Sequence, residues 1–249
     1  MTPLDLAVLC DPVTRCPLEQ RAQSLFSGPS IYRIEEGIPI FAPAPDRLNL
    51  KYQRMYDRIA PLYDFAEHAY KRIVKRDIRA FLSDAFELRP RMRILEVSIG
   101  TGANLRLLPS DAEIHGLDLS MGMLRACRRN LRRQHREAIL YQGEAERLPF
   151  RDNTFDLVFH VGGINFFNDR RSALQEMLRV ARPSTRIVVS DETEKVVAGA
   201  YQRIPFVNRY FRKRTAPVTS PAELLPPETA DVQCTLVNRD KLYCLTFRK

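Results

Sequence analysis

The stretch RILEVSIGTG, residues 93–102, decides the fold of this chain. Its first half is an apolar run of strand length, and its second half is a loop in which Gly100 and Gly102 stand two positions apart. Glycine lets a backbone turn sharply and approach a ligand closely, because it has no Cβ. A helix beginning near Gly102 would direct free backbone N–H groups at the polar end of such a ligand. Taken alone, the pattern also fits an ordinary turn from strand to helix.

Apolar runs of strand length alternate with helix-length segments on both sides of this loop. The pattern predicts strands at about 92–97, 113–118, 138–142, 154–160 and 185–190, and helices at about 49–61, 66–87, 102–109, 121–134 and 169–181. Strands that alternate with helices form a parallel sheet, which right-handed crossovers cover on both faces. Near the C-terminus two strand-like runs, Val232–Val237 and Leu242–Phe247, flank a polar turn and predict an antiparallel hairpin.

Acidic residues follow the second and third predicted strands. Asp118 ends the second strand, where a carboxylate can accept hydrogen bonds from both hydroxyls of a ribose. Glu144 lies in the loop after the third strand and is well placed to accept a hydrogen bond from an adenine amino group. Ligands of open α/β sheets bind at the carboxyl ends of the strands. The spacing therefore predicts a nucleoside site at this edge.

The residue at position 105 argues against a dinucleotide. The dinucleotide fingerprint requires a third glycine three positions after the second, so that helix and strand can pack closely beside a pyrophosphate. Position 105 is Leu105. A single nucleoside with a zwitterionic tail suits this loop better, and hydride transfer is a poor fit.

Residues from about 52 to 249 resemble class I S-adenosylmethionine-dependent methyltransferases. The segment Met55–Asp64 is similar to the first helix of the ubiquinone/menaquinone C-methyltransferase group, and Gly143–Phe150 with Phe155–Val158 is similar to that group's adenine loop and fourth strand. The resemblance implies an α/β fold with a Rossmann-like seven-stranded sheet, mostly parallel with an antiparallel C-terminal hairpin, flanked by helices. It also implies S-adenosylmethionine as the cofactor.

The resemblance also implies a cofactor site. It comprises Tyr63, Glu96, Ser98, Gly100, Gly102, Asp118, Leu119, Met123, Glu144, Ala145 and His160. Glu96 and the two glycines would contact the methionine part of the cofactor, Asp118 the ribose, and Glu144 the adenine edge. The apolar members that follow Asp118 would pack against the adenine, and Tyr63 would lie near the cofactor carboxylate. Ser98 stands where the family usually has its first glycine, so the first turn of the loop is expected to differ slightly.

The function predicted from this resemblance is transfer of a methyl group to a small hydrophobic or aromatic acceptor, at carbon or oxygen. Such a transfer needs alignment and a dry site, and it needs a base only where the nucleophile arrives protonated. His160 ends the fourth predicted strand and is the first candidate base, although it also fits a role as a strand cap or a partner of a loop carbonyl. Weaker candidates are Tyr63, His68 and Asn165, for which core or surface roles are favoured. Asp191 and Glu192 follow the fifth predicted strand and face either the pocket or solvent.

Two other functions stay open on the sequence. An RNA or protein methyltransferase suits the net charge of +9, but residues 160–163 lack the Asn-Pro-Pro-Tyr-like tetrad that such enzymes carry after the fourth strand. A nucleoside-binding assembly or regulatory protein would keep the fold without turnover. The oligomeric state is not predicted.

Residues 1–46 are predicted to form a small β-rich module ahead of a methyltransferase domain at 47–249. The module resembles the zinc-ribbon-like domains that precede or partner some methyltransferases. A ribbon needs four ligands, and this segment offers only Cys10 and Cys16, so no metal is expected. The module is interpreted as a metal-free packing element or substrate lid.

Composition and charge restrict the location and the partners. No apolar run approaches the roughly 20 residues needed to span a bilayer, which favours a cytoplasmic protein. Basic patches leave peripheral contact with an anionic membrane surface, or with RNA, as alternatives to a solvated face. One patch is a mixed aromatic and basic segment at 201–214. The other is a helical stripe formed by Arg125, Arg128, Arg129, Arg132, Arg133 and Arg136.

Overall fold

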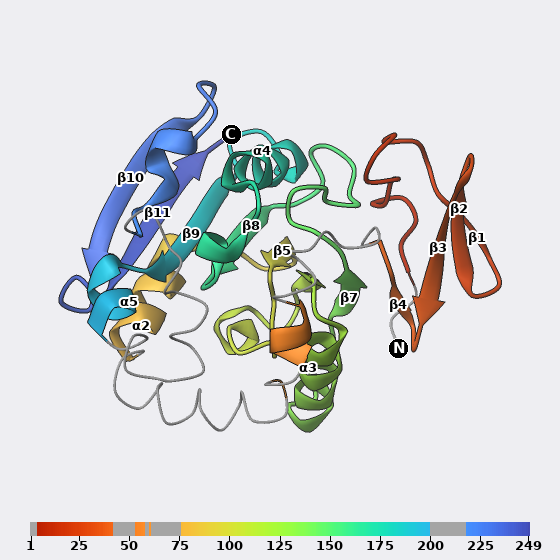
Figure 1. The fold of residues 1–249 in the computed structure, drawn as a ribbon, viewed down its shortest axis with the longest axis horizontal. Helices are drawn as coiled ribbons and strands as arrows, with labels where there is room; N and C mark the ends of the chain where they lie inside the picture. The colour runs from red at the N-terminus through yellow and green to blue at the C-terminus, as the bar shows by residue number, and fades with distance from the viewer. Residues whose placement is uncertain (1–3, 42–52, 58–59, 61–75, 200–217) are drawn as a thin grey trace.

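The structure is a computed structural model that describes residues 4–41, 53–57, 60, 76–199 and 218–249 (Figure 1). Two sheets organise these residues. A seven-stranded sheet forms the centre, and a four-stranded antiparallel sheet from the N-terminal segment lies beyond its β7 edge.

The central sheet has the strand order β10-β11-β9-β8-β5-β6-β7. Its strands are β5 (Arg93–Val97), β6 (Glu113–Asp118), β7 (Ile139–Gln142), β8 (Leu157–Val161), β9 (Arg186–Glu192), β10 (Ala230–Val237) and β11 (Leu242–Arg248). Strands β5 to β9 pair in parallel, whereas β11 runs antiparallel to both β9 and β10. The predicted sheet, mostly parallel with a C-terminal hairpin, is confirmed. The order reverses between β5 and β8, and ligands of such sheets bind at this switch point.

Helices cover both faces of the sheet, as predicted. They are α2 (Arg76–Ala85), α3 (Met121–Arg133), α4 (Arg170–Val180) and α5 (Glu194–Gly199). Alternate residues of β5 enter different cores: Ile94 packs with buried residues of α3, and Leu95 packs with those of α4. The N-terminal ends of α3 and α4 are capped by Ser120 and Asp169, whose side chains accept hydrogen bonds from backbone N–H groups.

The predicted helix at 102–109 is wrong. The structure has a single 3-10 turn there, η1 (Leu105–Leu107). Gly102 adopts a φ of +77°, outside the helical region, and Pro109 follows closely, so too little chain is left for an α-helix. The fourth strand also begins later than predicted, because Phe155 forms only an isolated bridge with Ala181. The predicted helix at 49–61 is described only at 53–57 and 60, which are helical, and residues 66–75 lie outside the described residues.

The N-terminal segment forms the predicted β-rich module. Its strands are β1 (Glu19–Arg21), β2 (Ser24–Ser27), β3 (Ser30–Glu35) and β4 (Ile38–Pro39). Leu9, Leu25 and Ile34 from this segment belong to the same buried cluster as Tyr141 of β7 and Phe150. The apolar core is therefore continuous from the module into the central sheet, and the division of the chain at residue 46 stays a prediction.

The arginine stripe of α3 is only partly a solvated face. Arg125 and Arg128 form ion pairs with Glu36, in the turn between β3 and β4. Arg136 donates hydrogen bonds to the carbonyl oxygens of Leu108 and Pro109, at 3.0 and 2.8 Å. These three arginines bind the module and the loop after η1. The remaining members, Arg129, Arg132 and Arg133, are exposed.

Within the described ranges, no helix is long and apolar enough to cross a membrane.

Candidate nucleoside-binding site

The loop after β5 is built from residues with left-handed backbone conformations. Ser98, Gly100 and Gly102 have φ values of +59°, +56° and +77°. The backbone N–H of Ile99 donates to the carbonyl of Leu117 at 3.0 Å, which ties the loop to β6. Ser98 stands where the resemblance leads one to expect a glycine, and it adopts a left-handed φ that glycine takes without strain. For a residue that carries a Cβ, this conformation costs about 1–2 kcal/mol.

The two glycines of the loop have different surroundings. A Cβ added to Gly102 would lie 2.8 Å from Cys127 Sγ and 3.0 Å from Leu105 Cδ1, so this glycine allows the loop to pack on α3 and η1. A Cβ added to Gly100 would meet no described atom within 4 Å. Gly102 is thus required by packing, whereas Gly100 borders open space that a ligand can fill.

Asp118 closes the opposite side of this space. Its Oδ2 accepts a hydrogen bond from the N–H of Gly100 at 2.8 Å, and its Oδ1 accepts one from the N–H of Ser120 at 2.9 Å. Burial raises the pKa of Asp118 to about 6, although these two N–H groups act against the shift. A carboxylate offers about four acceptor sites, so Asp118 can accept further hydrogen bonds from a ligand.

Three other predicted residues lie around Gly100 and Asp118. Glu96 is fully buried on β5, and its Oε1 accepts a hydrogen bond from Asn104 Nδ2 at 2.8 Å. Leu119 is half-buried directly after Asp118, and Met123 is buried in the first turn of α3. The structure therefore brings the end of β5, the end of β6 and the start of α3 to one place.

The loop at 143–150 joins this group through its first residue. The N–H of Gly143 donates to the carbonyl of Asp118 at 3.1 Å. Glu144 follows and is half-buried, and Ala145 is buried. The segment predicted to contact adenine therefore begins beside the residue predicted to bind the ribose.

His160 lies on the other side of β5, and its side chain is fully buried. Its Nδ1 lies 2.9 Å from the carbonyl oxygen of Val97, an obligate acceptor, so Nδ1 carries the proton and Nε2 is left as an acceptor. Nε2 has no hydrogen-bond partner among the described residues. Burial lowers the pKa of His160 to about 4, so the ring is neutral near pH 7. The sequence left open that His160 bonds to a loop carbonyl. The structure shows a bond to a carbonyl, but this carbonyl belongs to Val97, the last residue of β5.

Asn165 and Asp191 lie together beyond His160. Asn165 Nδ2 donates to Asp191 Oδ2 at 2.9 Å, and Asp191 Oδ1 accepts the N–H of Glu192 at 2.8 Å. Burial raises the pKa of Asp191. This carboxylate holds the loop after β8 against the end of β9, and Glu192 is half-buried beside it. Tyr63, His68 and the segment 201–214 lie outside the described residues.

One residue that supports the site was missed from the sequence. Asp57, in the helical residues 53–57, accepts hydrogen bonds from Ser120 Oγ and from the N–H of Gly122 at 2.9 Å. It therefore places a carboxylate at the N-terminus of α3, where the helix dipole favours negative charge. A Cβ on Gly122 would lie 2.9 Å from Asp57, so the glycine was the available signal, although a weak one.

Comparisons with known proteins show which proteins this chain is similar to. Residues 95–189 match the family model described as "Methyltransferase domain". The demethylmenaquinone methyltransferase of Renibacterium salmoninarum is 36% identical over 138 residues, which cover 55% of this chain and 56% of that protein. The chain thus spans little more than half the length of the first curated relatives that it matches.

Solved structures share the fold at low sequence identity. A SAM-dependent methyltransferase from Aquifex aeolicus has a TM-score of 0.52 and 15% identity, and the match covers 71% of this chain and 90% of that one. The [4+2]-cyclase SpnF has a TM-score of 0.60 and 18% identity, with 84% and 98% covered. The fold alone therefore does not determine the reaction.

Proposed function

We propose that this chain, whose residues 95–189 match the methyltransferase-domain family, binds S-adenosylmethionine. It transfers the methyl group to a small hydrophobic or aromatic acceptor at carbon or oxygen. The observation that carries this proposal is the pair formed by Asp118 and Gly100. The buried carboxylate of Asp118, at the end of β6, accepts a hydrogen bond from the N–H of Gly100, in the loop after β5. A Cβ on Gly100 would meet no described atom within 4 Å, so this glycine borders open space.

The residues present fit this cofactor. Asp118 has acceptor capacity for both ribose hydroxyls, and Gly100 leaves space for a ligand against the backbone. Met123 and Leu119 supply apolar contacts for the adenine ring, and Glu144 supplies an acceptor for its amino group. Glu96, whose Oε1 accepts a hydrogen bond from Asn104, would bind the cationic end of the methionine part.

The chemistry needs little from the protein beyond position. S-adenosylmethionine, when bound, supplies an electrophilic methyl group on a sulfonium. Glu96, the glycine loop and Asp118 would hold it in one orientation, which contributes to rate by alignment. The neutral His160, with Nε2 as its acceptor, would orient an acceptor hydroxyl or receive its proton. Asn165 and Asp191 would hold the loop that borders the acceptor side.

The acceptor class rests on the relatives. The matching protein of Renibacterium salmoninarum is named for demethylmenaquinone, a hydrophobic quinone, and the match is about one third identical. This supports a small hydrophobic acceptor for this chain. Two alternatives must be tested against this acceptor class. One is an RNA or protein acceptor, and the other is an assembly role without turnover.

Incubation of the purified chain with methyl-labelled S-adenosylmethionine tests the proposal. The acceptors are demethylmenaquinone, simple phenols, total RNA and a protein extract, and Asp118→Asn is the matched control. Transfer to the quinone or phenol fraction, lost in the control, is expected. Transfer to RNA or protein alone would overturn the acceptor class, and binding without transfer to any fraction would favour the assembly role.

We also propose that the exposed arginines of α3, Arg129, Arg132 and Arg133, contact an anionic membrane surface. A basic patch is attracted to such a surface by about 1 kcal/mol per residue, which would bring the chain to a lipid-soluble acceptor. Flotation with phosphatidylglycerol vesicles, but not with neutral ones, is expected, and it should be lost when all three arginines become glutamine. Equal flotation of the variant would contradict this contact.

A further inference from the structure

The N-terminal module contacts the loop at 143–150 at both of its ends. At the first end, the N–H of Phe41 donates to the carbonyl of Gln142 at 2.7 Å, directly before the loop. At the second end, the N–H of Cys10 donates to the carbonyl of Pro149 at 3.0 Å, and Leu9 forms an antiparallel bridge with Phe150. Two separate segments of the module therefore pair with the backbone on either side of the predicted adenine contact.

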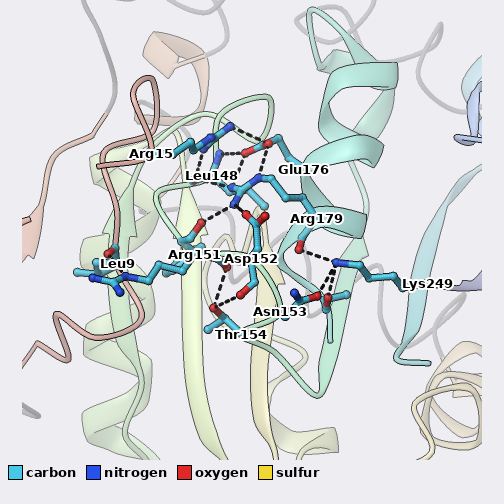
Figure 2. Close-up of polar contacts among 12 residues, drawn as sticks. Leu9, Arg15, Leu148, Arg151, Asp152, Asn153, Thr154, Glu176, Arg179 and Lys249 are labelled. Carbon is cyan, nitrogen blue, oxygen red and sulfur yellow. Dashed lines mark hydrogen bonds and ion pairs between the residues drawn. The ribbon is translucent and has the colours of Figure 1, made fainter. Parts of the chain in front are cut away.

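A charged side chain from the module holds the loop between these ends (Figure 2). Arg15 donates to the carbonyl of Leu148 at 3.0 Å and to Glu176 Oε1 at 2.8 Å. Glu176 of α4 is buried, and its Oε2 accepts the N–H of Leu148 at 2.8 Å. Arg179 donates to the same carbonyl at 3.1 Å and to Glu176. The peptide groups on both sides of Leu148 Cα are thus held by charge-assisted hydrogen bonds.

Arg15 is itself held in place by the module. Its φ of +64° lies in the left-handed region, which costs free energy unless the surroundings impose it. The N–H of Arg15 donates to the carbonyl of Asp11 at 2.9 Å, and the buried Asp11 carboxylate accepts from the N–H of Thr14 and from the hydroxyl of Tyr32. Because Tyr32 lies on β3, the turn that presents Arg15 depends on the module sheet.

The remaining fixed point of the loop lies on α4. Glu146 Oε1 accepts the N–H groups of Asn168 and Asp169 at 3.0 and 3.3 Å, at the N-terminus of that helix. Glu144 and Ala145 lie between this point and Gly143, which is bonded to Asp118. The residues predicted to face adenine therefore lie in a short part of the loop whose two flanks are fixed by contacts from outside the loop.

We propose that the N-terminal module sets the position of the adenine loop and thereby the affinity for the cofactor, with Arg15 as the positioning residue. This inference rests on the proposed function, because it assumes that residues 143–150 contact the nucleoside. The module is then part of the cofactor site and not a substrate lid. Coupling between sites is reciprocal, so cofactor binding must in turn stabilise the docked module.

Calorimetric titration with S-adenosylhomocysteine tests the role of Arg15. The variant Arg15→Met keeps the aliphatic stem and removes the hydrogen bonds. Its matched control is Arg21→Met, because Arg21 lies on the exposed surface of the same module, where it pairs with Glu19 and stacks over the Phe26 ring. We expect Kd to rise about tenfold in Arg15→Met, within the usual range of coupling between sites, and to stay unchanged in Arg21→Met. Arg15→Lys should restore affinity only in part, because lysine lacks the planar fork.

Two further measurements separate positioning from a general loss of stability. The KM for S-adenosylmethionine should rise in Arg15→Met while kcat at saturation and the KM for the acceptor stay within twofold. In the unmodified chain, S-adenosylhomocysteine should slow hydrogen exchange at Cys10, Phe41 and Leu148, whose N–H groups lie at the contact. This second readout does not depend on whether any variant folds.

The outcomes distinguish this inference from the proposed function. Unchanged Kd in Arg15→Met, or no slowing of exchange at Cys10 and Phe41, would overturn the role of the module. The proposed function would survive either result, provided that Asp118→Asn still weakens binding. Failure of the unmodified chain to bind S-adenosylhomocysteine would overturn the proposed function itself, and this inference with it.

Discussion

The two halves of the sheet's carboxyl edge differ in the groups that form them. On the side of β5, β6 and β7, a loop with left-handed φ at Ser98, Gly100 and Gly102 follows β5. The buried carboxylate of Asp118 accepts the backbone N–H groups of Gly100 and Ser120 there. On the side of β8 and β9, the edge carries the polar side chains of His160, Asn165 and Asp191. In the proposed function, the first half would hold the cofactor and the second would border the acceptor.

Alanine at the two glycines should give the largest effects and separate packing from binding within the first half. Gly102→Ala forces a Cβ to 2.8 Å from Cys127 Sγ, and overpacking together with the left-handed φ should cost about 2–4 kcal/mol of stability. Gly100→Ala meets open space, so it should lose only about 1–2 kcal/mol of stability but most of its cofactor affinity. Chemical denaturation and calorimetry measure both. Equal stability losses would contradict the distinction.

Replacement of His160 tests the second half. His160→Gln keeps a donor and an acceptor but cannot take up a proton, so kcat should fall by about 100-fold where the acceptor arrives protonated. The Kd for S-adenosylhomocysteine should stay within twofold if His160 serves the acceptor, whereas a clear rise in Kd would support the alternative that His160 belongs to the cofactor site. Steady-state kinetics and calorimetry give the two numbers. Full turnover in the variant would mean that His160 takes no part in proton transfer and only donates its hydrogen bond to the carbonyl of Val97.

The pH dependence of binding should come from the first half. Asp118, with its pKa raised to about 6, must be ionised to accept hydrogen bonds from both ribose hydroxyls. Affinity should therefore be constant above about pH 7 and fall by about tenfold for each pH unit below 6, as the carboxyl takes up a proton. Calorimetry from pH 5 to 8 measures this. Asp118→Asn should give a flat profile at low affinity, and a midpoint far from 6 in the unmodified chain would contradict the assignment.

The smallest effect is expected at Ser98. Glycine relieves the left-handed φ of +59° but adds freedom to the unfolded chain, so Ser98→Gly should stabilise the fold by at most about 1 kcal/mol. Urea denaturation resolves such a difference, and cofactor affinity should be unchanged or slightly higher. A clear loss of stability would mean that the serine side chain contributes contacts that outweigh its strain.

The sequence predicted the strands and the residues at their ends better than it predicted contacts between distant segments. The apolar runs around residues 93–102 have strand length, and a carboxylate directly after a strand, such as Asp118, must lie at the carboxyl edge. The failed helix at 102–109 and the bonds from Arg125 and Arg128 to Glu36 depend on contacts between distant segments. The same is true of Arg15 and Glu176, which lie 161 positions apart. No local period or propensity encodes such pairs.

Titration of the purified chain with S-adenosylhomocysteine, beside Asp118→Asn, tests the central claim most directly. The account predicts a micromolar Kd for the unmodified chain and a Kd at least about 30-fold higher for the variant, because hydrogen bonds to a charged acceptor contribute about 1.5–3 kcal/mol each. Absence of micromolar binding, or equal affinity of the two proteins, would contradict it.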